Sequence, residues 1–232
     1  MQRLLLILIA SASLMTQAQN LQLHYDFRHT VSPAQNPRNF TTLYFEYWKK
    51  QDSGRSVVKP RSFLFKTEAD FYGAGNNIGK FFLQVSQSLR FWKPKIYLAL
   101  QYSGGAGITE PKQYSYYISN TFSAGLEYPF QWKGVWLTSQ LYLRYTPSSV
   151  DPLFTLYWWK GFLHYRLEIA GDFSIWTQNT NGRKRIYFFA EPQLWYKLLE
   201  QLSLGTKLTL YRPSDTNGPL QIAPTIAARW RL

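Results

Sequence analysis

The feature that most restricts the fold is a two-residue alternation in the stretch 187–197, which reads YFFAEPQLWYK. Two faces result: Phe188, Ala190, Pro192, Leu194 and Tyr196 on one, and Tyr187, Phe189, Glu191, Gln193 and Trp195 on the other. Successive side chains of a β-strand point to opposite faces, so one face is apolar and the other carries a carboxylate, an amide and rings. This pattern is typical of a barrel wall between lipid and a polar lumen.

The same alternation recurs along the chain in segments about as long as a tilted membrane strand. The predicted segments are residues 21–28, 42–48, 63–72, 81–91, 96–103, 114–128, 135–145, 153–159, 163–178, 187–197, 202–212 and 220–232. The segment 153–159 is apolar on both faces, so the sequence leaves its register open. No apolar run of about 18 residues exists, which excludes a helical membrane protein. We therefore predict an all-β fold, a transmembrane antiparallel β-barrel of twelve strands.

Residues 1–18 have the features of a secretory signal peptide. Arg3 precedes an apolar run at 4–10, and small residues surround a cleavage point after Ala18. We expect residues 19–232 to form a single domain in the bacterial outer membrane. The chain has no cysteine, so it has neither a lipid-modified N-terminal cysteine nor a disulfide.

The charges give an independent check, because the alternation assigns them to the polar, inward faces. The inward carboxylates are Asp26, Glu46, Glu68, Asp70, Glu127, Glu168, Asp172 and Glu191, and the inward bases are Arg28, Lys66, Arg90, Arg144, Arg166, Lys207, Arg229 and Arg231. No charge falls in the middle of an outward face, where a basic residue would cost about 2–4 kcal/mol in lipid. A soluble sandwich would show the same alternation, but it does not predict the signal segment, the rhythm of external loops or so many rings at strand ends.

The connections are predicted to alternate between short turns and longer loops. Short turns are expected at 92–94, 160–161 and 198–201, and longer loops at 28–38, 104–112, 178–184 and 213–219. The stretch 49–60 is long and basic although it falls on the short-turn side. Pro192 and Pro224 lie inside predicted strands, so bulges or local bends are expected there.

The predicted lumen of about twelve strands would hold a narrow passage lined by equal numbers of acids and bases and by many rings. Such a lining suits a small, flat and polar solute, because rings stack and carboxylates and amides hydrogen-bond its edges. The predicted solute-binding residues are Asp26, Arg28, Glu46, Trp48, Lys66, Glu68, Asp70, Tyr72, Arg90, Arg166, Glu168, Trp176, Glu191, Gln193 and Trp195. The alternative is that the rings fill the lumen and the barrel is only structural.

Three stretches carry a family resemblance: YFFAEPQLWYKL at 187–198, DFYGAGNN at 70–77 and FFLQVSQSLRFW at 81–92. They resemble the nucleoside-specific channel-forming outer-membrane (Tsx-like) family and its Bacteroidetes relatives. The resemblance implies a monomeric barrel that nucleosides cross by diffusion, with Asp70, Tyr72, Glu191, Gln193 and Trp195 facing the channel. The chain departs from that family in its shorter length and in ending with Trp230-Arg231-Leu232 instead of a terminal Phe.

A small outer-membrane lipid-modifying enzyme and a nucleic-acid-binding protein are the rival classes. His24, His29 and His164 could serve catalysis, but no Gly-x-Ser-x-Gly motif occurs. His24 shares a face with Asp26, as Glu68 does with Asp70, and hydrogen-bond networks or ion pairs account for both. We expect no catalytic residue, cofactor or metal. The net charge of +13 suits lipopolysaccharide and anionic lipid as partners, whereas export argues against nucleic acid.

Overall fold

The computed structural model describes residues 18–50, 58–110, 112, 114–180, 182–212 and 220–232. The strands are β1 (Ala18–Asp26), β2 (Phe40–Lys50), β3 (Lys59–Phe71), β4 (Lys80–Arg90), β5 (Tyr97–Ile108), β6 (Ser115–Trp132), β7 (Val135–Thr146), β8 (Ser149–Phe162), β9 (Leu167–Thr180), β10 (Arg183–Ala190), β11 (Gln193–Lys197), β12 (Leu202–Arg212) and β13 (Gln221–Arg231). Two short helices follow β1 and β3: α2 (Arg28–Val31) and the 3₁₀ helix η1 (Ala74–Asn76).

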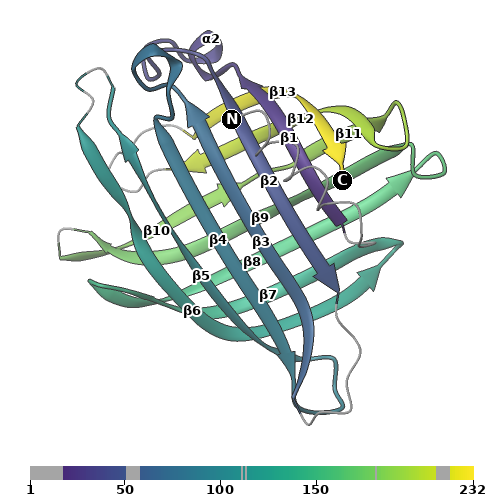
Figure 1. Cartoon of the computed structure of the whole chain (residues 1–232). Helices are drawn as coiled ribbons and strands as arrows, with labels where there is room; N and C mark the ends of the chain where they lie inside the picture. Colours follow the sequence, from purple (N-terminus) through teal and green to yellow (C-terminus); the bar gives the residue numbers. More distant parts are fainter. Residues whose placement is uncertain (1–17, 51–57, 111, 113, 181, 213–219) are drawn as a thin grey trace, which may run out of the picture.

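All strands belong to one antiparallel sheet, which closes on itself (Figure 1). Each strand from β1 to β9 pairs with its neighbour in sequence, and β13 pairs with both β12 and β1. β10 and β11 both lie between β9 and β12, so thirteen strands fill twelve positions of the wall. The predicted twelve-stranded antiparallel barrel is therefore confirmed.

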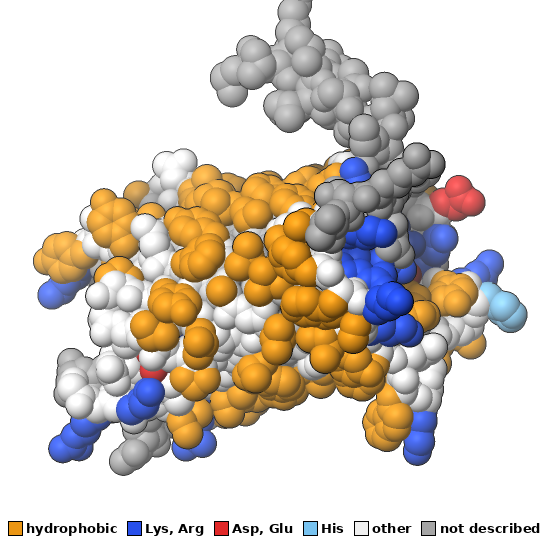
Figure 2. Space-filling model, turned by 90° about the horizontal axis from the view of Figure 1, so that it is seen from below, with side chains coloured by type: hydrophobic (Ala, Val, Ile, Leu, Met, Phe, Trp, Pro, Cys, Tyr) orange, Lys and Arg blue, Asp and Glu red, His pale blue; other side chains and the backbone are white. Residues whose placement is uncertain are grey.

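The outer surface of the barrel is apolar and the inner surface is polar. Figure 2 shows a broad band of hydrophobic side chains, with lysine and arginine side chains gathered towards its two ends. Exposed hydrophobic side chains of the strands include Leu23, Phe122, Leu141 and Ile226. The eight carboxylates predicted to face inward are all buried or half-buried. Alternation with period two therefore separates outward-facing from lumen-facing residues as predicted.

The two ends of the barrel are distinct. The α2 end contains the loops 27–39 and 72–79, and the terminal end contains the start of β1 and the end of β13. Among the described residues, no helix is long and apolar enough to span a membrane. The predicted signal segment lies outside the described residues except for Ala18, the first residue of β1.

Several turns differ from the prediction because the strands run further than the alternation indicated. β8 continues through 160–161, and the turn after it is formed by residues 163–166. Leu163, His164 and Tyr165 have φ angles of 51°, 56° and 62°. The left-handed backbone of this turn reverses the chain, so 163–166 is not the start of a strand.

At the α2 end, two predicted long loops are wrong for the same reason. β5 extends to Ile108, and β9 and β10 are separated by only residues 181 and 182. The sheet of β8 and β9 also settles the open register of β8, with Asp151, Leu153 and Thr155 buried inside. The predicted loops 49–60 and 213–219 fall largely on residues outside the described part of the chain.

Pro192 and Pro224 each interrupt a ladder of backbone hydrogen bonds, but the register is the same on both sides of each proline. Pro192 separates β10 from β11, yet Ala190 pairs with Phe173 and Gln193 with Ala170, which is one register. Gly171 permits the approach of Glu191, because a Cβ there would lie 2.6 Å from the Glu191 carbonyl oxygen. The β12–β13 ladder likewise breaks beside Pro224 and resumes in register. The expected local irregularities are confirmed, although neither inserts an extra residue.

A charge on the outer band should destabilise the barrel according to its depth. Leu141 lies in the middle of β7 and is exposed, whereas Val150 lies near an end of β8. We expect Leu141→Arg to lower the free energy of unfolding by about 2–4 kcal/mol, and Val150→Arg by about 0–1 kcal/mol. Reversible urea unfolding in phospholipid vesicles measures both, and equal losses would contradict a lipid-facing band.

Candidate functional site

A cavity of about 480 Å³ occupies the half of the barrel nearer the α2 end. Its lining comes from nearly every strand and from α2. The charged lining residues are Asp26, Arg28, Lys66, Glu68, Asp70, Lys80, Arg144, Asp172, Glu191 and Lys207. Five are acidic and five are basic, so the formal charges of the wall cancel.

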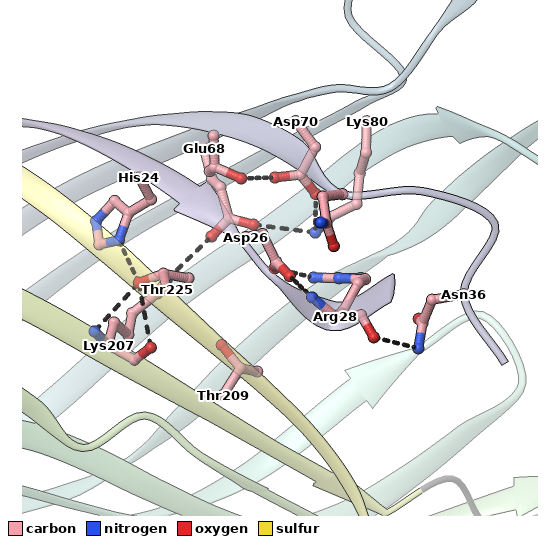
Figure 3. A network of polar contacts seen from close by, with 12 residues as sticks. His24, Asp26, Arg28, Asn36, Glu68, Asp70, Lys80, Lys207, Thr209 and Thr225 are labelled. Atoms are coloured by element: carbon pink, nitrogen blue, oxygen red, sulfur yellow. Dashed lines mark hydrogen bonds and ion pairs between the residues drawn. The ribbon is translucent and has the colours of Figure 1, made fainter. Parts of the chain in front are cut away.

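One wall of the cavity is a continuous ion-pair network (Figure 3). Lys80 donates to Glu68 and Asp70 at 3.0 Å and 2.9 Å. Lys207 lies 2.9 Å from Glu191 and 4.0 Å from Glu68, which connects β3 to β12 across the barrel. Buried charges are costly unless they are paired, so these contacts set the side-chain positions on this wall.

The rim at the α2 end is built around Arg28. Its guanidinium donates to Asp26 at 2.7 Å and lies 4.5 Å from the centre of the Phe40 ring. Burial disfavours its charge, but the hydrogen bond and the charge of Asp26 outweigh this and raise the pKa of Arg28. Asn36 donates to the Arg28 carbonyl, and Arg38 pairs with Glu110 at 2.6 Å. The loop 27–39 is thus tied to β1 and to the β5–β6 loop.

His24 supports a hydroxyl that replaces hydrogen bonds missing from the β12–β13 ladder. Its Nδ1 lies 3.0 Å from Thr225 Oγ1, and its Nε2 lies 2.8 Å from Gln22 Oε1. Thr225 Oγ1 accepts from the Lys207 N–H and donates to the Lys207 carbonyl, both at 3.1 Å. The hydroxyl therefore replaces missing ladder bonds, and His24 buttresses it.

The opposite wall, from β7 to β10, carries rings and one arginine. The rings of Trp176 and Tyr187 stack at 5.3 Å with an interplanar angle of 6°. The Arg144 guanidinium lies 5.6 Å from the centre of the Trp176 ring, and Arg144 Nη1 donates to Gln178 at 3.4 Å. Leu153 and Phe189 add apolar surface to this wall.

Below the cavity, towards the terminal end, a layer of packed side chains fills the barrel; we call it the floor. At its centre is Trp195, which is 0% exposed. The Arg229 guanidinium lies 4.6 Å from the centre of the Trp195 ring and donates to Glu168 at 2.6 Å. Trp195 Nε1 donates to Gln193 at 3.0 Å. Arg231 makes a second ion pair with Glu168.

The filling continues on the other side of the terminal half. Glu127 accepts from Ser88 at 2.7 Å and from Gln140 at 2.8 Å, and Tyr44 donates to Glu46 at 2.9 Å. The described lumen is thus a cavity above and a hydrogen-bonded floor below. The sequence prediction of a narrow passage fits only the upper half.

The structure brings most of the predicted site residues together. Seven line the cavity: Asp26, Arg28, Lys66, Glu68, Asp70, Trp176 and Glu191. Four belong to the filled half: Glu46, Glu168, Gln193 and Trp195. Tyr72 lies at the rim, where its ring packs 5.2 Å from that of Phe40.

Three predicted site residues lie away from the cavity. Arg166 is exposed in the turn 163–166, because β9 begins only at Leu167. Arg90 ends β4 and donates to the carbonyls of Trp92 and Lys93, which close the following turn. Trp48 lies near the end of β2 and is exposed. Arg90 and Trp48 have the inward parity that was predicted, but they lie at strand ends, which project beyond the lumen.

The prediction missed Lys80, Lys207, Asp172 and Arg144 as site residues. Lys80 immediately precedes the predicted strand 81–91 and shares the parity of its inward residues, so extending that strand by one residue finds it. The other three were assigned to inward faces but were not selected, because alternation gives the side of the wall and not the depth. The described residues contain no group of three or more potential ligands for a metal ion.

Comparison with known proteins identifies the family. Residues 18–232 match the model described as Domain of unknown function (DUF5020), so the chain belongs to that family. Comparison with curated proteins gave no match.

Solved structures show the same fold at low identity. The chain is similar to the NanC porin, with 8% identity, a TM-score of 0.51 and coverage of 93% of this chain and 100% of that one. It is similar to a KdgM porin in complex with disordered oligogalacturonate, with 7% identity, a TM-score of 0.50 and coverage of 92% of this chain and 99% of that one. It is also similar to outer membrane phospholipase A from Escherichia coli, with 8% identity, a TM-score of 0.51 and coverage of 92% of this chain and 90% of that one. The chain thus has an outer-membrane barrel fold shared by porins and an enzyme.

The Lys207–Glu191 pair should be needed for stability because both side chains are buried. We expect Lys207→Met to cost about 3–5 kcal/mol of unfolding free energy, since it leaves Glu191 buried without its partner. Adding Glu191→Gln should recover much of that loss. Arg38→Gln, which breaks a more exposed pair, should cost about 0–1 kcal/mol. Urea unfolding of the four proteins tests this, and a double variant no better than Lys207→Met would contradict it.

Proposed function

As a member of the DUF5020 family with a porin-like barrel, the protein is, we propose, a narrow outer-membrane channel for small polar solutes. The observation that carries the proposal is the cavity of about 480 Å³ inside a closed barrel, with a charged yet balanced lining. A barrel that only needed a filled lumen would have no reason to keep ten charged side chains around an internal space.

The α2 end is proposed to face the cell exterior. Loops 27–39 and 72–79 are long, and outer-membrane barrels carry their longer loops outside. Arg183 and Lys184 lie exposed at the same end, where lipopolysaccharide phosphates are available as partners. A monomer in the bacterial outer membrane, exported through a cleaved signal peptide, fits this arrangement. The solute would enter the cavity first.

The floor is then the narrow segment of the route. Trp195, Arg229 and Glu168 belong to three different strands and are held by one another. Opening a path requires only side-chain movement, because the described floor consists of side chains. The channel would thus conduct rarely and in small steps.

Nucleosides are the proposed solutes on the strength of the sequence resemblance. The rings of the cavity and its amide and carboxylate groups could contact a base and a sugar. The NanC and KdgM neighbours are called porins, and one is a complex with an oligogalacturonate, so neither supports nucleosides.

A catalytic role is less well supported by the same residues. His24 lies inside the barrel, His29 donates from Nδ1 to the Asn36 carbonyl in the loop 27–39, and His164 lies in the turn 163–166 at the opposite end. The hydroxyl that His24 contacts belongs to Thr225, and its two bonds to the Lys207 backbone hold β12 to β13. A nucleophile needs a free hydroxyl and a base.

Removing the floor ring should open the channel. In planar bilayers we expect residues 19–232 to give small, infrequent conductance steps, and Trp195→Ala to increase the open fraction several-fold by removing the largest floor side chain. Trp230→Ala is the matched control, because Trp230 is an exposed ring on the same sheet. Absence of conductance in both the wild type and Trp195→Ala would sink the channel proposal.

Nucleoside specificity can be tested in the same bilayers. Adenosine or thymidine should block the current in a saturable way if nucleosides bind in the cavity. Trp176→Ala should weaken the block about tenfold, because tenfold is about 1.4 kcal/mol and the loss of one stacked base costs about 1–3 kcal/mol. Conductance without any block would retain the channel and remove nucleosides as its solutes.

A further inference from the structure

Arg144 differs from the other basic residues of the cavity. Arg28, Lys80 and Lys207 each pair with a cavity carboxylate. Lys66 also has no ion pair among the described residues, but its charge interacts with those of Asp172, Glu191 and Glu68. Among the described residues, Arg144 has no carboxylate within the 4.0 Å of an ion pair, and its one side-chain hydrogen bond, to Gln178, is 3.4 Å long.

The nearest candidate partner of Arg144 is already occupied. Asp151 lies opposite Arg144 in the β7–β8 register and is 1% exposed. Its carboxylate accepts from Ser149, from Thr177 at 3.0 Å and from Lys184 at 3.4 Å. A carboxylate with three partners has little capacity left. The charge and most of the five N–H donors of Arg144 therefore remain available to the cavity.

The surface beside Arg144 is apolar and flat. Trp176 is stacked on Tyr187, so its ring plane is held in place. Leu153 and Phe189 line the cavity next to it. A guanidinium above an indole, bordered by aliphatic and aromatic surface, offers hydrogen-bond donors and a flat contact in one place.

We propose that this wall is a subsite for a planar ring that carries a single acidic group, such as a ring carboxylate. The acidic group accepts two hydrogen bonds from the Arg144 guanidinium, and the ring packs against Trp176, Leu153 and Phe189. The inference rests on the proposed function, because the ligand is a solute that enters the cavity.

The rest of the cavity limits the ligand to one negative charge. Without Arg144, the charged lining consists of five carboxylates and four bases. These bases are engaged with those carboxylates or lie among them. A second acidic group on the ligand would face surplus negative charge, so monoanions should bind better than dianions.

Calorimetric titration of refolded residues 19–232 in detergent micelles tests the subsite with four probes. Benzoate has a planar ring and a charge, benzamide has the ring alone, and cyclohexanecarboxylate has the charge on a puckered ring. We expect benzoate to bind at least tenfold more tightly than either of the others. Phthalate, the corresponding dianion, should bind more weakly than benzoate.

Variants assign the binding to Arg144. Arg144→Gln should weaken benzoate binding about 10- to 100-fold and leave benzamide unchanged, because the lost bonds are to a charged group. Arg144→Lys should restore part of the affinity, since it keeps the charge but not the planar donor pair. Arg90→Gln is the matched control: it removes the same charge from the end of β4, outside the cavity, and should leave benzoate binding unchanged. Circular dichroism and the electrophoretic shift on heating show that each variant is folded.

The outcomes separate this inference from the proposed function. No benzoate binding to the wild type, or equal binding to Arg144→Gln, would overturn the subsite even if the barrel conducts. Benzoate binding that needs Arg144 in a barrel that never conducts would retain the subsite and overturn the channel. If Arg144→Gln does not fold, benzoate affinity is measured instead in Arg144→Lys and at increasing salt concentration. A benzoate affinity that changes neither in Arg144→Lys nor with salt would overturn the subsite.

Discussion

The structure depends on keeping one inside–outside parity around a closed sheet. In lipid every backbone N–H and C=O must pair within the protein, and closing β13 onto β1 satisfies this without an exposed edge. Closure also means that a one-residue slip in any strand would turn its charges toward lipid. The register that continues across Pro192 shows this constraint, because the ladder loses bonds there while the parity of Glu191 and Gln193 is kept. Beside Pro224, the contacts of His24 and Thr225 likewise keep the parity of the strand.

That constraint explains what could be predicted from the sequence. Alternation is a local property, so the strand positions and the inward side of residues such as Glu68 and Glu191 follow from short windows of sequence. Strand ends are decided by turn geometry, which alternation does not contain. The left-handed turn after β8 therefore places Arg166 outside the barrel, and β4 begins one residue earlier than the alternation predicts, at Lys80. The Tsx-like resemblance stays a prediction.

The division of the lumen into a cavity and a floor could not be predicted, because it depends on which inward residues of different strands lie at the same depth. Trp195, Glu168 and Arg229 come from β11, β9 and β13 and meet only after the staggered sheet has closed. Each was predicted to face inward, but nothing in the local pattern places one ring beneath a guanidinium from a distant strand. Depth is a property of the assembled barrel.

The ionic interactions of the two halves have different consequences for transport. In the floor, Arg229 is bound by Glu168 and by the Trp195 ring, so moving it would expose a buried pair that is costly to break. On one wall of the cavity, Lys80 and Lys207 are paired with carboxylates. On the other wall, most N–H donors of Arg144 remain available to a solute. In the proposed channel, selection and permeation therefore belong to separate layers. The solute would be recognised in the cavity, where a charge is available, and would pass only where the paired charges of the floor separate, so tighter binding in the cavity need not produce faster passage through the floor.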